Sequence, residues 1–86
     1  MIFEINFTNK TSFEKGWTEL EMLASQLMGD MKLTKGVSGV TGEFAVVELE
    51  EIDDTIALMK TLKEMANKDI HWCLNANWWS NTDKED

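Results

Sequence analysis

The chain has one histidine and one cysteine, and they lie two residues apart in its C-terminal quarter. His71 and Cys73 fall in a segment that alternates apolar and polar residues, so in a strand they share one face, about 7 Å apart. Such a pair could supply a nucleophile with its general base, or two metal ligands. Zinc normally takes three or four strong ligands, and Glu4 or Glu48 would have to complete the set. The pair therefore predicts an exposed strand face with a free thiol, without catalysis or metal binding.

A run of acids in the middle of the chain is the most concentrated charge. Five of the seven residues from 48 to 54 are acidic: Glu48, Glu50, Glu51, Asp53 and Asp54. The run lacks the aspartate, asparagine and glycine pattern of a calcium loop. It precedes a helical segment, so Asp53 or Asp54 is expected to cap the helix N-terminus. Because capping needs one or two acids, the others predict an electrostatic contact surface.

The excess of acid extends to the whole chain. Its 86 residues contain 16 acids, eight lysines and no arginine, for a formal net charge of −8. A nucleic-acid-binding protein needs a basic footprint to neutralise phosphates, so direct nucleic-acid binding is not expected. Attraction to a basic protein surface is the functional interpretation, because opposite potentials steer partners together. Solubility alone is the alternative explanation.

Length and composition indicate one small domain. With 43% hydrophobic residues, 86 residues are enough for a single modest core. No apolar run is long enough to cross a membrane, and the N-terminus lacks a signal-peptide pattern. A lone cysteine is typical of a reducing compartment. We expect a cytoplasmic protein with one domain over residues 1–79 and an acidic polar tail over residues 80–86.

Strand patterns occur in four segments. Residues 2–8 and 70–79 alternate apolar and polar side chains, as half-buried strands do. Residues 43–50 contain an apolar run that is typical of a central strand. A shorter edge strand is expected over residues 31–37, with a glycine-containing turn over residues 38–41.

Two segments have the spacing of amphipathic helices. The first is expected to begin near Ser12, with Thr11 and Glu14 at capping-box spacing, and to end near Gly29. The second follows the acid run and ends near Lys68. The predicted core stripe of the first helix is Phe13, Trp17, Leu20, Ala24, Leu27 and Met28, with Leu23 at its margin. That of the second helix is Ile52, Ile56, Met59, Leu62 and Ala66, widened by Leu58 and Met65.

The order strand, helix, strand, strand, helix, strand predicts a ferredoxin-like α+β sandwich. Its four-stranded antiparallel or mixed sheet would carry both helices on one face. We expect the first and third strands in the centre, parallel to each other, and the second and fourth strands at the edges. If the strand over residues 31–37 does not form, a three-stranded βαβαβ arrangement is the alternative.

The sheet face without helices is the expected interaction surface. Turning Phe44, Val46 and Glu48 outward keeps the Glu48 carboxylate out of the core, which favours this phase over its opposite. Mixed apolar and polar faces of this kind are often interfaces. The expected outer face comprises Glu4, Asn6, Phe44, Val46, Glu48, His71, Cys73, Asn75, Asn77 and Trp79.

These features predict a non-enzymatic binding protein that occupies a basic, nucleic-acid-binding surface of a partner protein. An inhibitor of a restriction or CRISPR nuclease, carried by a phage or mobile element, would be one such protein. No cofactor or metal is expected. The predicted partner-binding residues are Glu48, Glu50, Glu51, Asp53, Asp54, Phe44, Val46 and Trp79, the last as an exposed aromatic hot spot.

Two other classes of function are consistent with the sequence. The first is a structural homodimer or small-ligand module that pairs through the open sheet face or the edge strands. The second is a small enzyme or thiol protein that uses Cys73. Binding that weakens with salt would favour the acidic binding protein, whereas salt-independent self-association would favour the homodimer.

Overall fold

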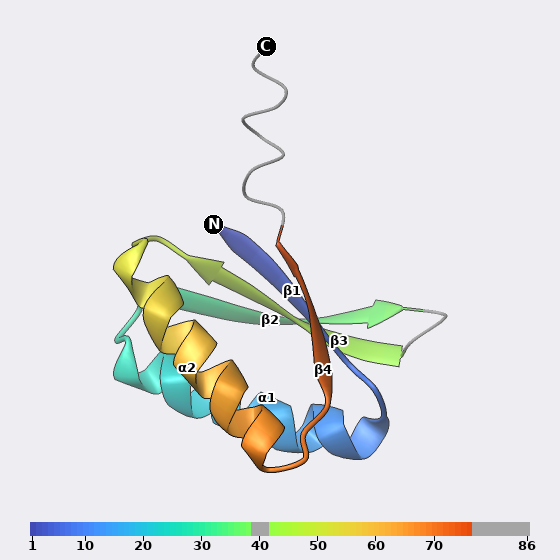
Figure 1. Ribbon diagram of the computed structural model, residues 1–86. Helices are drawn as coiled ribbons and strands as arrows, with labels where there is room; N and C mark the ends of the chain where they lie inside the picture. The colour runs from blue at the N-terminus through green and yellow to red at the C-terminus, as the bar shows by residue number, and fades with distance from the viewer. Residues whose placement is uncertain (39–41, 77–86) are drawn as a thin grey trace.

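The computed structural model describes residues 1–38 and 42–76 as four strands and two helices (Figure 1). In chain order they are β1 (Ile2–Phe7), α1 (Lys10–Gln26), β2 (Met31–Ser38), β3 (Gly42–Leu49), α2 (Asp53–Asn67) and β4 (Trp72–Ala76). This is the predicted ferredoxin-like α+β order, and β2 forms, so the three-stranded alternative does not apply. The domain boundary predicted after residue 79 and most of the predicted 38–41 turn lie outside the described residues. None of the helices in the described part of the chain is long and apolar enough to cross a membrane.

The sheet has the strand order β2-β3-β1-β4, with β1 and β3 in the centre and β2 and β4 at the edges, as predicted. The prediction that β1 and β3 run parallel is wrong, because they pair antiparallel. The physical reason is the β2–β3 hairpin. Helix α1 returns the chain so that β2 runs in the direction of β1, and the hairpin then reverses β3. All three neighbouring pairs are antiparallel.

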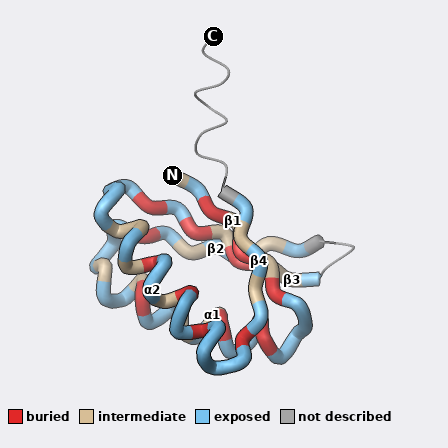
Figure 2. The backbone as a smooth tube through the Cα atoms, viewed as in Figure 1, coloured by how far each residue is buried: buried red, intermediate tan, exposed pale blue. Residues whose placement is uncertain are grey.

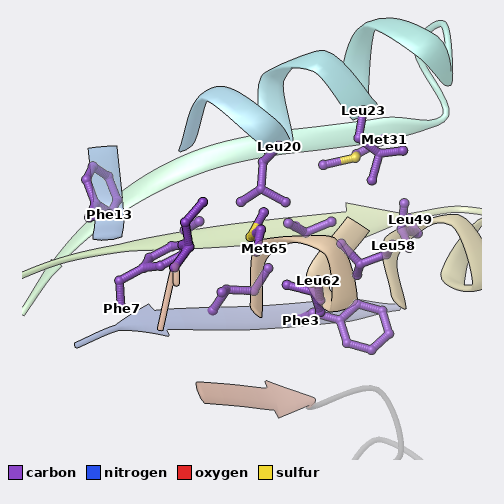
Figure 3. Close-up of a cluster of buried hydrophobic side chains, with 14 residues drawn as sticks. Phe3, Phe7, Phe13, Leu20, Leu23, Met31, Leu49, Leu58, Leu62 and Met65 are labelled. Atoms are coloured by element: carbon purple, nitrogen blue, oxygen red, sulfur yellow. The ribbon is translucent and has the colours of Figure 1, made fainter. Parts of the chain in front are cut away.

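Both helices cover one face of the sheet, and the core lies between the two layers (Figures 1 and 2). In β3, the buried side chains are Ala45, Val47 and Leu49, at 0%, 0% and 1% exposure, which confirms the predicted phase of this strand. Helix side chains converge on the strand side chains in Figure 3. The buried core is Phe3, Ile5, Phe7, Phe13, Leu20, Leu23, Met31, Ala45, Val47, Leu49, Leu58, Leu62, Met65 and Ile70.

Helix α1 begins two residues earlier than predicted because Asn9 caps it. The Asn9 side-chain oxygen accepts a hydrogen bond from the Ser12 backbone N–H at 2.8 Å, so the predicted capping box is wrong. Leu23 belongs to the core, whereas Met28 lies beyond the helix end and is 88% exposed. Gly16 lets the helix approach the sheet, because a Cβ there would lie 2.3 Å from the Phe7 ring.

Helix α2 is rotated relative to the prediction. Its core residues are Leu58, Leu62 and Met65, while the other members of the predicted stripe are exposed: Ile52, Ile56, Met59 and Ala66. At 100° per residue, the apolar side chains of this helix span about 180°, and the sheet covers one half of that arc. The exposed half is centred roughly 120° from the buried half. A wide apolar arc does not specify which of its edges faces the core. The prediction placed the middle of the arc against the sheet, whereas in the structure one edge of the arc lies there.

Candidate functional site

The chain leaves β3 through a loop whose backbone is held at both sides. The Leu49 N–H donates to the Met1 carbonyl oxygen at 2.9 Å, and the Glu50 N–H donates to the Asp30 carbonyl oxygen at 3.3 Å. The first bond ties the end of β3 to the start of β1, and the second ties it to the residue before β2. The acid run therefore starts from a fixed position at one end of the sheet.

Four of the predicted acids have exposed side chains at this end: Glu48, Glu50, Glu51 and Asp53. The structure adds Asp30, also exposed, which the sequence analysis missed. Met31 pairs with Leu49 in the β2–β3 ladder, so Asp30 must lie beside the residue that follows β3. The expected pairing of residues 31–37 with residues 43–50 across a short turn was the signal that could have placed it there. We refer to Asp30, Glu48, Glu50, Glu51 and Asp53 as the acidic end.

The carboxylates of the acidic end take part in no ion pair among the described residues. The ion pairs of the described part of the chain lie elsewhere: Lys35 pairs with Glu43 at 3.8 Å, and Lys68 pairs with Glu19 at 3.0 Å. Lys32 lies opposite Glu48 in the ladder and lines the same shallow hollow, so one lysine neighbours the cluster. The acidic end thus offers several carboxylates to an external cation.

Asp54 differs from the other predicted acids. It is half-buried, and among the described residues its Oδ2 atom is buried with no hydrogen-bond partner. Neither Asp53 nor Asp54 caps α2, because Ile52 holds the N-cap position without a side-chain hydrogen bond. The capping prediction is therefore wrong. Both acids nevertheless lie in the first turn, where the helix dipole favours negative charge.

The open sheet face carries Phe44, Val46 and Glu48 along β3, with spacings of two residues. Phe44 and Val46 are half-buried, and Glu48 is exposed. The Phe44 ring lies over Gly36 of the neighbouring strand, where a Cβ would come within 2.4 Å of it. Because Glu48 lies on the open face and also belongs to the acidic end, the apolar part of the open face adjoins the acidic end.

The β1 and β4 side of the open face is polar. The Asn6 side-chain amide donates to Glu4 Oε2 at 3.0 Å, and Cys73 lies opposite Asn6 in the ladder with an exposed free thiol. His71 precedes β4, and its backbone N–H donates to the Ser12 hydroxyl at 3.2 Å. The described residues contain no group of three or more His, Cys, Asp or Glu side chains arranged to hold a metal ion. Trp79, the predicted aromatic hot spot, and Asn77 lie outside the described residues.

Comparison with protein-family models, with curated proteins and with solved structures gave no match to this chain. The surface that joins the acidic end to the open sheet face is therefore the basis for inferring a function.

Proposed function

We propose that this protein is a non-enzymatic, cytoplasmic binding protein that occupies a basic, nucleic-acid-binding surface of a partner protein. The observation that carries the proposal is the acidic end, five carboxylates held at one end of the sheet without ion pairs among the described residues. A groove that binds nucleic acid presents lysine and arginine to phosphates. Closely spaced carboxylates can occupy the same cations, and the net charge of −8 steers the approach.

The charge pattern supports one class of partner, a protein with a nucleic-acid-binding groove. A phage or mobile-element inhibitor of a restriction or CRISPR nuclease would act in this way, by filling the groove that the nuclease uses for nucleic acid. In this proposal Phe44 and Val46 add apolar contact next to the carboxylates, and Trp79 is the aromatic hot spot predicted from the sequence. Such contact is useful because charge complementarity contributes more to association rate and specificity than to affinity.

The test is affinity capture from a host lysate with two matched variants. The first carries Glu48→Gln, Glu50→Gln and Glu51→Gln and removes three charges from the acidic end. The control carries Glu14→Gln, Glu21→Gln and Glu64→Gln, which removes three charges from exposed helix positions. We expect the first variant to fold normally, to capture less of a basic protein and to associate with it on the order of tenfold more slowly.

The same capture experiment is repeated at several salt concentrations. The difference between the wild-type protein and the acidic-end variant should shrink as ionic strength rises, because screening already weakens the wild-type attraction. The helix control should behave like the wild type. Equal capture by both triple variants would mean that only total charge matters. Capture that does not change with salt would contradict the electrostatic proposal.

A structural homodimer or small-ligand module that uses the open sheet face is the second candidate. The observation in its favour is the apolar strip of that face, where Phe44 and Val46 are half-buried and Ile2 is 39% exposed. A strip of this kind is suited to pairing with a second copy. Sedimentation equilibrium at several salt concentrations would distinguish the two, because a face-to-face dimer should persist at high salt.

A further inference from the structure

The exposed side of α2 is an apolar patch beside the acidic end. Ile52, Ile56 and Met59 are 73%, 59% and 40% exposed and follow one another at spacings of four and three residues. These spacings place them in one stripe on the helix surface. Single exposed apolar side chains are common on proteins, but a contiguous stripe marks a surface suited to binding.

The stripe borders a recess of ≈ 570 Å³, which is within the range of binding pockets. Its lining is mostly apolar: Met1, Phe3, Glu50, Ile52, Thr55 and Met59. Phe3 is 4% exposed, so it belongs to the bottom of the recess, whereas Ile52 is at its margin. A large apolar side chain could enter this space and contact the core through Phe3.

The charge around the recess is polarised. Glu50 belongs to the lining, and the exposed Glu51 and Asp53 flank Ile52 in the chain. The exposed Lys60 and Lys63 follow Met59 and lie about two and three turns beyond Ile52 along α2. One end of the stripe is therefore negative and the other positive, so a bound segment that carries cations should direct them toward the acidic end.

We propose that the recess binds an apolar side chain from a basic amphipathic segment of the partner, whose lysines or arginines lie against Glu50, Glu51 and Asp53. This inference rests on the proposed function and adds the position and chemistry of the anchor. Charge complementarity favours this occupant over a second copy of the chain. A symmetric contact through the same patch would bring two acidic ends together, which like-charge repulsion opposes.

Residues 77–86 of the same chain are the other candidate occupant. They contain Trp78 and Trp79 but also three acids and only one lysine. Like charge at the acidic end therefore argues against them. The experiment below treats occupation by this segment as a separate outcome.

The probe is a synthetic amphipathic peptide of about 16 residues, long enough to form a helix on binding, with lysines on one face and leucines on the other. Binding is followed by NMR of the full-length protein with ¹³C-labelled methionine methyl groups. Met1 and Met59 line the recess, whereas Met22 and Met28 are exposed elsewhere, at 55% and 88%. We expect the peptide to shift the Met1 and Met59 signals and to leave those of Met22 and Met28 unchanged.

Two variants and one control peptide sharpen the result. Ile52→Ser should weaken peptide binding by about tenfold, as loss of a central anchor contact does. It should not unfold the protein, since Ile52 is exposed at the N-cap of α2 and serine is a preferred N-cap residue. Met22→Ser, on the outer side of α1, should bind like the wild type. A peptide with serines in place of its leucines should lose most of its affinity.

Several results would overturn the recess proposal. Absence of peptide binding would do so, as would binding that leaves the Met59 signal and the Ile52→Ser affinity unchanged. If the serine peptide binds equally well, charge alone is responsible. If Trp78→Ser shifts the Met59 signal without peptide, the chain's own segment fills the recess. The variant with Glu48→Gln, Glu50→Gln and Glu51→Gln tests the proposed function separately. If it captures less of the basic partner protein, that function is supported even when the peptide leaves the Met59 signal unchanged.

Discussion

The two faces of the sheet are built from the same strands and differ in what covers them. On β1, Ile5 faces the helices and is 0% exposed, while Ile2 faces outward and is 39% exposed. On β3, Val47 is buried and its neighbour Val46 is half-buried. The buried side chains of the covered face are all apolar, whereas the open face combines apolar side chains with Glu4, Asn6 and Glu48. Strand alternation thus separates the residues that stabilise the fold from those available for contact.

Helix α2 shows the same contrast between buried and exposed apolar side chains, although a helix has no two-residue alternation to separate them. Leu58, Leu62 and Met65 face the sheet, and Ile52, Ile56 and Met59 remain exposed on the other half of a wide apolar arc. Such an arc exceeds what the core of a small domain can cover. Surplus apolar surface beside a cluster of carboxylates is what a binding protein needs, and this is the physical link between the fold and the two proposals.

The largest expected difference between the faces is in stability. Ile5→Ala should lower the free energy of unfolding by about 2–5 kcal/mol, because it leaves a cavity in the core. Ile2→Ala, in the same strand but on the open face, should lower it by about 1 kcal/mol or less. Urea denaturation followed by tryptophan fluorescence measures both. Equal losses would show that the open face is covered in solution.

A smaller difference is expected at two glycines that lie against phenylalanine rings. Gly16→Ala places a Cβ against Phe7 in the core, and the clash should outweigh the gain in helix propensity, for a net loss of about 1–3 kcal/mol. Gly36→Ala places a Cβ against Phe44, a half-buried ring on the open face that can turn toward solvent. Its cost should stay below about 1 kcal/mol. Thermal unfolding of both variants provides the comparison, and a Gly36→Ala variant as unstable as Gly16→Ala would show that Phe44 is held in place.

Strand patterns predicted the buried side chains of this protein more accurately than helix patterns did. Strand alternation has a period of two and allows only two phases, so Ala45, Val47 and Leu49 were placed correctly. The apolar arc of α2 allowed a continuous range of rotations, and Ile52 and Ile56 were assigned to the wrong side. The order of strands in the sheet was predicted correctly from chain connectivity. The direction of β3 relative to β1 was predicted wrongly, because the β2–β3 hairpin reverses the chain and this reversal was not taken into account.

The candidate site was predicted in part. Four exposed acids were recognised from their density in the chain, but Asp30 lies 18 residues before Glu48 and joins them only through the β2–β3 ladder. The burial of one Asp54 oxygen likewise depends on how the α2 N-terminus packs, which no local pattern encodes. The recess combines the start of β1 with one side of α2. Because the helix phase was predicted wrongly, the recess could not be anticipated.

The smallest expected effect concerns Cys73, the free thiol of the open face. It is exposed and lies opposite Asn6. We therefore expect it to react with a thiol reagent at a rate close to that of the same thiol in denaturant, with no dependence on protein concentration. A covered thiol would react only through opening of the structure and would be much slower. If the rate falls as protein concentration rises, copies of the chain cover this face, and the homodimer becomes the better explanation of the open sheet. If the thiol stays reactive at all concentrations, no second copy covers this face, and the face is free to contact a different protein.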